Sequence, residues 1–195
     1  MEESARLRSA DSAPILFFNA STRIHHLSLN AAFGQLASWA IRAQGEPVLP
    51  LVCHQGMEQC ILGTDRRNPA GPPPCRPCIQ LSEVLFAGPV AWLHLRPDIV
   101  AEVASELKDR SLDALTTWEH RGLALGKLCL PGLRWALRRH NLPDTDPVRL
   151  LFRRYLASAA SLAVQVERVI EETQPRALVV FNGIFFPEAV AREVA

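Results

Sequence analysis

Length, composition and charge place this chain among ordinary globular proteins. Its 195 residues are 48% hydrophobic and 21% charged, which is enough for one sizeable core, and its net charge is only +1. This balance gives no general attraction to nucleic acid or to an anionic membrane, so nucleic acid is not expected as a partner. No apolar run approaches the ~20 residues of a membrane helix, and the polar start lacks a secretory signal. We therefore expect no transmembrane segment and a cytoplasmic location.

A β-α-β unit is predicted at the start of the chain. Residues 1–13 form a polar leader that we expect to be disordered, and residues 14–19 are an apolar run typical of a buried parallel strand. A second strand is expected at 47–53, although Pro50 weakens that prediction. The helix between them, at about 27–44, is predicted from apolar residues at steps of three and four: Leu29, Phe33, Leu36, Ala40 and Ala43. Such a unit implies a right-handed crossover and a parallel sheet.

Helices dominate the rest of the chain. Asp146 is a good N-cap for the clearest helix, with Pro147 in its first position and helical spacing kept to Val169. Residues 177–181 then return as a buried strand. Shorter elements are expected as a strand within 90–95, a helix from Pro97, a helix over 111–127, a helix over 131–140 and a last helix from Pro187.

These elements predict an α/β fold. We expect a Rossmann-like parallel sheet with helices on both faces, a helix-rich insertion and a cysteine-rich loop over 53–78. The last predicted helix has no following strand, so we expect the chain to be an incomplete piece of a longer protein.

Four cysteines fall close together, with the spacing C-x6-C-x14-C-x2-C: Cys53, Cys60, Cys75 and Cys78. The last two form a CxxC that we expect on a proline-rich turn, with both thiolates aimed at one centre. Four thiolates suit a closed, tetrahedral, structural zinc site. His54, His25 and His26 are spare nitrogen ligands if one cysteine does not take part. The alternatives are reduced loop cysteines or a disulfide, and a reducing cytoplasm disfavours the disulfide.

The ends of the predicted strands supply the candidate binding residues. The sequence contains neither a GxGxxG nor a Walker motif, and no GxSxG or HExxH, so only position in the sheet remains as a guide. Ligands of open α/β sheets bind beyond the carboxyl ends of the strands. The segments after the first and last strands should therefore share one rim, through Asn19, Ser21, His25, His26, Asn182 and Gly183. The competing interpretation is a plain turn at Asn182-Gly183 and solvated histidines.

Two groups of arginines have an ordinary explanation. They are Arg134, Arg138 and Arg139, and Arg149, Arg153 and Arg154. A solvated helix face explains such runs better than a phosphate-binding patch does.

Four segments of the chain, taken in order, resemble a known family. They are the opening strand and helix, the block CHQGMEQC…PPPCRPC, the segment EHRGLALGKLCLPGLRWALRR and the closing PRALVVFNGIFFPEAVAREVA. Over residues 14–195 the chain resembles the amino-terminal part of bacterial glycosyltransferases of capsular or surface-polysaccharide biosynthesis. The resemblance implies a GT-B enzyme with two Rossmann domains, in which this half holds the glycan acceptor. A second half, absent here, would bind the nucleotide-sugar donor. No catalytic residue follows from the resemblance.

Two functions remain open from the sequence. The first is the acceptor-side half of a glycosyltransferase that is inactive alone, because transfer requires donor and acceptor pockets facing each other. The second is a zinc-stabilised binding module without chemistry of its own.

Overall fold

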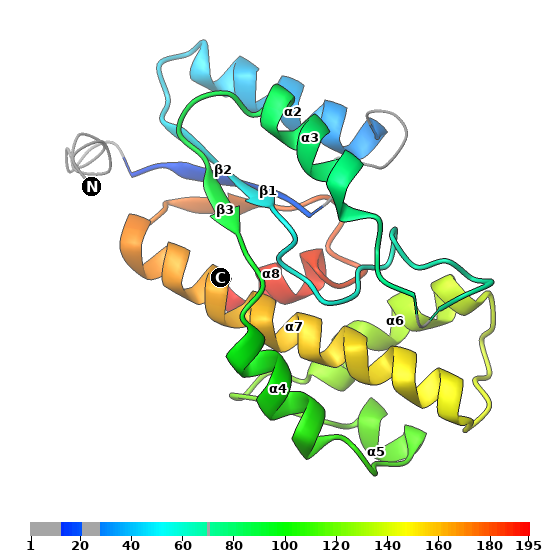
Figure 1. Cartoon of the computed structure of the whole chain (residues 1–195). Helices are drawn as coiled ribbons and strands as arrows, with labels where there is room; N and C mark the ends of the chain where they lie inside the picture. Colours follow the sequence, from blue (N-terminus) through cyan, green and yellow to red (C-terminus); the bar gives the residue numbers. More distant parts are fainter. Residues whose placement is uncertain (1–12, 21–27, 70) are drawn as a thin grey trace.

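The computed structural model describes residues 13–20, 28–69 and 71–195. Residues 1–12 of the predicted leader therefore lie outside the described part. The strands are β1 (Ile15–Asn19), β2 (Val48–Cys53), β3 (Ala91–Leu93) and β4 (Ala177–Val179). They form one all-parallel sheet in the order β3-β2-β1-β4, which confirms the predicted α/β, Rossmann-like class (Figure 1).

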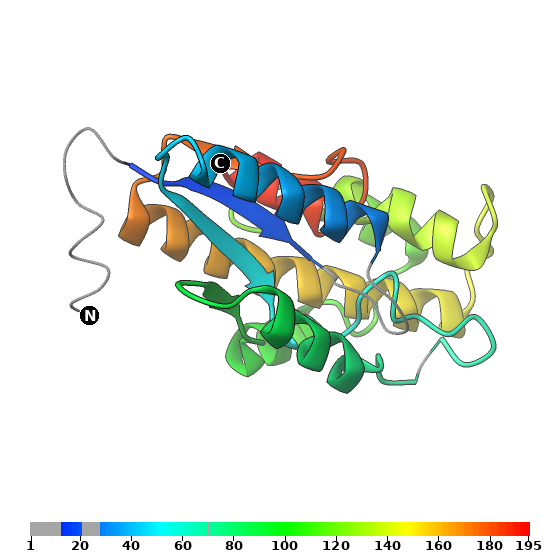
Figure 2. The same ribbon diagram turned by 90° about the horizontal axis from the view of Figure 1, so that it is seen from above.

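Helices cover both faces of the sheet. They are α2 (Leu29–Arg42), α3 (Cys75–Leu85), α4 (Pro97–Glu106), α5 (Leu112–Thr116), α6 (Leu125–Leu137), α7 (Asp146–Thr173) and α8 (Glu188–Val194). Helices α2 and α3 lie on one face, while α7 and α8 lie on the other, with α4, α5 and α6 packed around α7 (Figures 1 and 2). Within the described residues, no helix combines the length and the apolar character needed to cross a membrane.

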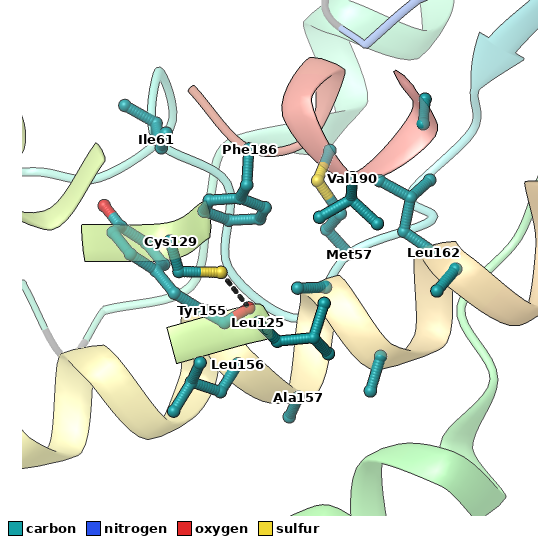
Figure 3. Packing of buried hydrophobic residues seen from close by; sticks show 14 of the residues in the cluster. Met57, Ile61, Leu125, Cys129, Tyr155, Leu156, Ala157, Leu162, Phe186 and Val190 are labelled. Carbon is teal, nitrogen blue, oxygen red and sulfur yellow. Dashed lines mark hydrogen bonds between the residues drawn. The ribbon is translucent and has the colours of Figure 1, made fainter. Parts of the chain in front are cut away.

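The core is centred on α7. This helix is continuously buried from Tyr155 to Ala163, and Cys129 of α6 and Phe186 pack against it (Figure 3). The rings of Tyr155 and Phe186 lie 5.0 Å apart between centroids. The helix begins one residue earlier than expected, with Thr145 as N-cap and Asp146 inside the helix. Apolar periodicity therefore predicted this element almost completely.

Helix α2 exposes the apolar stripe from which it was predicted, whereas an amphipathic helix is expected to bury that stripe. A surface helix normally turns its apolar stripe to the core, yet Leu29, Phe33, Leu36 and Trp39 are 87%, 68%, 61% and 52% exposed. The buried face instead carries Ala31, Gln35 and Ser38. Small and polar residues let this face lie close to the sheet and to α3, where Gln35 Nε2 donates to the carbonyl of Leu85 at 3.0 Å.

Other predictions were wrong in their details. Strand β4 is shorter than the expected 177–181 and lies at the sheet edge, so Val179 and Phe181 stay about 40% exposed. The predicted helix 111–127 breaks after Thr116, and α6 continues through Pro131 rather than starting there. Cys75–Cys78 is the first turn of α3, not a proline-rich turn, because the run of prolines ends at Pro74.

Candidate functional site

The carboxyl edge of the sheet has a topological switch point between β1 and β4. The chain leaves β1 towards β2 on one side, while β4 pairs with β1 on the other. Ligands of open parallel sheets bind where the strand order changes direction in this way. The topology therefore singles out the ends of β1 and β4 as the place for a site.

A cavity of about 310 Å³ lies at this switch point. We call it the edge cleft. Polar groups reach it from the ends of both strands, from the start of α2 and from α8: Asn19, Ser28, Asn30, Gln35, Asn182 and Glu188. Aromatic rings complete its wall: Phe17, Phe18, Phe33, Phe86 and Phe181. The structure thus brings Asn19 and Asn182, which are distant in sequence, into one cavity.

Gln35 presents an unsatisfied acceptor in the wall of the edge cleft. Its side chain is buried and its Nε2 donates to Leu85. Its Oε1 is also buried and has no hydrogen-bond partner among the described residues. A buried polar atom without a partner costs free energy, about 1–3 kcal/mol, unless a ligand or water supplies the bond. Gln35 therefore carries an unpaired acceptor beside the cleft, and a ligand would reach it only after the side chain moves.

Glu188 is the acidic group of the edge cleft. It begins α8, is partly buried, and also lines an adjoining cavity of about 220 Å³. Burial raises its pKa from 4.5 to about 7. A carboxyl group with a pKa near neutrality can accept or release a proton at physiological pH. Sequence reasoning missed this residue, because a glutamate in the first turn of a helix is an ordinary feature.

In the turn after β4, Asn182 lines the edge cleft but Gly183 does not. Both have left-handed backbones, with φ of 45° and 62°. Asn182 lines the edge cleft, and its Oδ1 accepts from the N–H of Ile184 at 3.1 Å, so its amide NH2 is the group that can donate to a ligand. Gly183 instead lies against Arg192, whose Nη1 donates to its carbonyl at 3.1 Å. Gly183 is therefore a turn residue beside the cleft rather than part of its wall.

Three of the predicted binding residues lie outside the described residues: Ser21, His25 and His26. Their segment connects Ala20 to Ser28, and both of these line the edge cleft. Their binding role stays a prediction.

The four clustered cysteines converge on one small cavity of about 30 Å³. Cys53 ends β2, Cys60 lies in the following loop, and Cys75 and Cys78 occupy the first turn of α3. All are free thiols, and burial raises the pKa of Cys53 and of Cys60 to about 12. As they stand, no three Cys, His, Asp or Glu side chains of the described residues are arranged to hold a metal ion. The cysteines are gathered, but their sulfur atoms do not form a coordination shell.

The other candidate ligands lie elsewhere. His54 Nε2 contacts Glu83 Oε1 at 3.3 Å, and its ring lies 4.9 Å from that of His94, so it does not line the cysteine cavity. Cys129 is fully buried in α6, with its Sγ 3.8 Å from the carbonyl oxygen of Tyr155 (Figure 3). His25 and His26 are outside the described residues.

Most of the clustered arginines are engaged within the chain. Arg149 pairs with Asp144 and Asp146, and Arg154 pairs with Glu58 at 3.1 Å. Arg138 lies over the ring of Trp135 at 4.7 Å. These contacts fit solvated helix faces that bind their own neighbours.

Comparison with known proteins gives no relative. No protein-family model, no curated protein and no solved structure matches the chain significantly.

Proposed function

We propose that this chain is the acceptor-side half of a glycosyltransferase that moves a sugar from a nucleotide donor to a surface polysaccharide or related glycan. The observation that carries the proposal is the edge cleft at the β1/β4 switch point, with the amides of Asn19, Asn30 and Asn182 and the carboxyl of Glu188 in its wall. The resemblance of the four sequence segments to capsular glycosyltransferases motivates the same proposal.

The composition of the edge cleft suits a carbohydrate. Sugar hydroxyls both donate and accept, as do the amides of Asn19, Asn30 and Asn182. Phe33 and Phe181 supply apolar surface for the C–H faces of a sugar ring. No arginine or lysine of the described residues lines the cleft, which disfavours a phosphate ligand, because phosphate recognition commonly uses these side chains.

Glu188 would act as the general base in this reaction. Its carboxylate would take the proton of the acceptor hydroxyl while that oxygen attacks the anomeric carbon of the donor sugar. The bond between the anomeric carbon and the donor phosphate oxygen breaks, and its electron pair leaves with the nucleotide. A pKa of about 7 suits a base that must also release its proton near neutral pH.

The donor is assigned to a second α/β domain facing the edge cleft. The isolated chain should therefore not transfer sugar, because positioning donor against acceptor supplies much of the rate. It should also not bind UDP- or GDP-sugars at micromolar concentrations. The proposal puts the protein in the cytoplasm, where its free thiols stay reduced.

A zinc-stabilised binding module without chemistry is the second candidate, favoured by the gathered cysteines. In both functions zinc would be structural, because four thiolate ligands leave no open position for a substrate. The two differ at Glu188. A transferase assembled with its donor domain loses turnover in Glu188→Gln, whereas a binding module has no turnover to lose.

Glycan binding tests the proposal on the purified chain. Screening immobilised bacterial glycans, followed by calorimetry of the best ligand, should give binding that Asn182→Ala weakens about tenfold, the effect of losing one good hydrogen bond. Glu102→Gln, on the exposed surface of α4, is the control and should bind normally. Absence of glycan binding, or micromolar binding of a nucleotide sugar instead, would contradict the assignment.

A further inference from the structure

We propose that Cys53, Cys60, Cys75 and Cys78 bind one zinc ion. This ion fixes the loop that lines the cavity of about 220 Å³ beside the edge cleft. The inference does not depend on sugar transfer. The four thiols come from three separate places: the end of β2, the loop after it and the start of α3. Nevertheless all four line the same small cavity.

Two matching bends present the first two sulfurs. In each, a cysteine is followed three residues later by a glycine whose N–H points to the cysteine sulfur. Gly56 N lies 3.4 Å from Cys53 Sγ, and Gly63 N lies 3.2 Å from Cys60 Sγ. Backbone N–H groups that donate to sulfur orient a metal-bound thiolate and offset its charge.

Glycine is required sterically at both bends. A Cβ on Gly63 would stand 2.8 Å from Cys60 Sγ and 2.7 Å from the Cβ of Pro73. A Cβ on Gly56 would stand 2.8 Å from the carbonyl oxygen of Leu93. The repeated Cys-x-x-Gly pattern is thus tied to a close packing that keeps both thiols at the cavity.

The other two sulfurs come from one helical turn. Cys75 and Cys78 are three residues apart at the start of α3, so their side chains project from the same face. The N-terminus of a helix carries partial positive charge, which favours thiolate over thiol. Pro74, the N-cap residue, makes no side-chain hydrogen bond to the helix.

The cavity suits one ion. Its volume of about 30 Å³ corresponds to roughly one or two water molecules, which is too little for a multi-iron cluster. The sulfurs do not coordinate in their present rotamers. A cysteine sulfur moves by about 3 Å between staggered rotamers without backbone movement, and the proposed shell would require side-chain rotation of this kind. A zinc ion held by four thiolates at about 2.3 Å would then displace the four thiol protons into solvent.

Zinc would tie the loop beside the cleft to α3. Met57 and Cys60 line both the cysteine cavity and the 220 Å³ cavity that Glu188 shares. On its other side this loop is already held to α7, where Gln59 N donates to Ser158 Oγ at 2.9 Å and Thr64 contacts the Tyr155 hydroxyl at 2.7 Å. The metal would therefore complete the anchoring from the α3 side.

Metal analysis of the untagged chain, purified under reducing conditions with zinc present, tests the site. We expect about one zinc per chain, and X-ray absorption showing four sulfur neighbours at ~2.3 Å. Cys53→Ser, Cys60→Ser, Cys75→Ser and Cys78→Ser should each lower the zinc content, whereas Cys129→Ala should keep it. Less than about a fifth of a zinc per folded wild-type chain, an iron–sulfur cluster or a shell with two or fewer sulfurs would overturn the proposal.

Hydrogen exchange on the wild-type chain tests the structural role without relying on variants that fail to fold. Removing zinc with a chelator should speed exchange of the amides from Met57 to Gly63 by about tenfold or more, with little change in α7. Equal exchange with and without zinc would overturn the anchoring role. Loss of glycan binding with an intact zinc site would instead count against the proposed function alone.

Discussion

Helices α7 and α2 lie on opposite faces of one sheet and bury opposite kinds of surface. Helix α7 turns its aromatic and aliphatic side chains inward, whereas α2 buries Ala31, Gln35 and Ser38 and exposes its apolar stripe. One of the exposed residues, Phe33, also lines the edge cleft. The α7 face therefore holds the fold together, while the α2 face leaves its apolar stripe exposed beside the edge cleft.

The largest expected difference between the α7 face and the α2 face is in the free energy of unfolding after one phenylalanine ring is removed from each. Phe152→Ala removes a fully buried ring of α7 and should lower the free energy of unfolding by about 3–5 kcal/mol. Phe33→Ala removes a ring of the same size that is 68% exposed, and should change it by less than about 0.5 kcal/mol. Urea denaturation of both variants measures the contrast. Similar losses in the two would show that α2 packs as a core helix.

A second prediction concerns the proton on Glu188. Because burial raises its pKa from 4.5 to about 7, the folded chain holds a proton that the unfolded chain releases. Ionising Glu188 therefore lowers the free energy of unfolding as the pH rises across that interval. Glu188→Gln should gain about 2 kcal/mol relative to wild type between about pH 4.5 and pH 8, after allowing for partial exposure.

Denaturation curves at several pH values measure this gain, with Glu102→Gln as the matched control. A constant difference between Glu188→Gln and wild type at every pH would show that Glu188 has an ordinary pKa. A gain of equal size in the control would show that the effect is not specific to Glu188.

The contact between the cysteine loop and α7 gives a smaller effect. Ser158→Ala leaves the buried N–H of Gln59 without its acceptor and should cost about 1–2 kcal/mol. Ser105→Ala, on the exposed surface of α4, should be nearly neutral. Thermal unfolding measures both. A neutral Ser158→Ala would indicate that water replaces the bond and that the loop is held elsewhere.

Local pattern predicted the elements whose environment is uniform. Strands β1 and β2 are continuous apolar runs with buried interiors, and α7 keeps its period throughout. Pattern failed where tertiary contacts decide. Proline suggested a break at Pro131, but α6 runs through it. Which face α2 buries depends on its contacts with the sheet and α3. The period of the apolar residues does not determine these contacts.

The sequence predicted the part of the candidate site that follows from strand topology, but not the part that depends on tertiary burial. Parallel topology brings the ends of β1 and β4 together, so the sequence predicted that Asn19 and Asn182 lie at one edge, and both line the edge cleft. Gln35 and Glu188 were not predicted, because what distinguishes them is how they are buried in the fold. That property depends on neighbours distant in sequence.

Chemical-shift mapping tests whether the edge cleft is a carbohydrate site. Amide and side-chain spectra of the labelled chain would be recorded during titration with the best glycan from the screen. We expect saturable shifts centred on Asn19, Asn30, Gln35, Asn182 and Glu188, with little change along α4 and α5. Shifts centred away from this cleft, or none at saturating glycan, would contradict a carbohydrate site there.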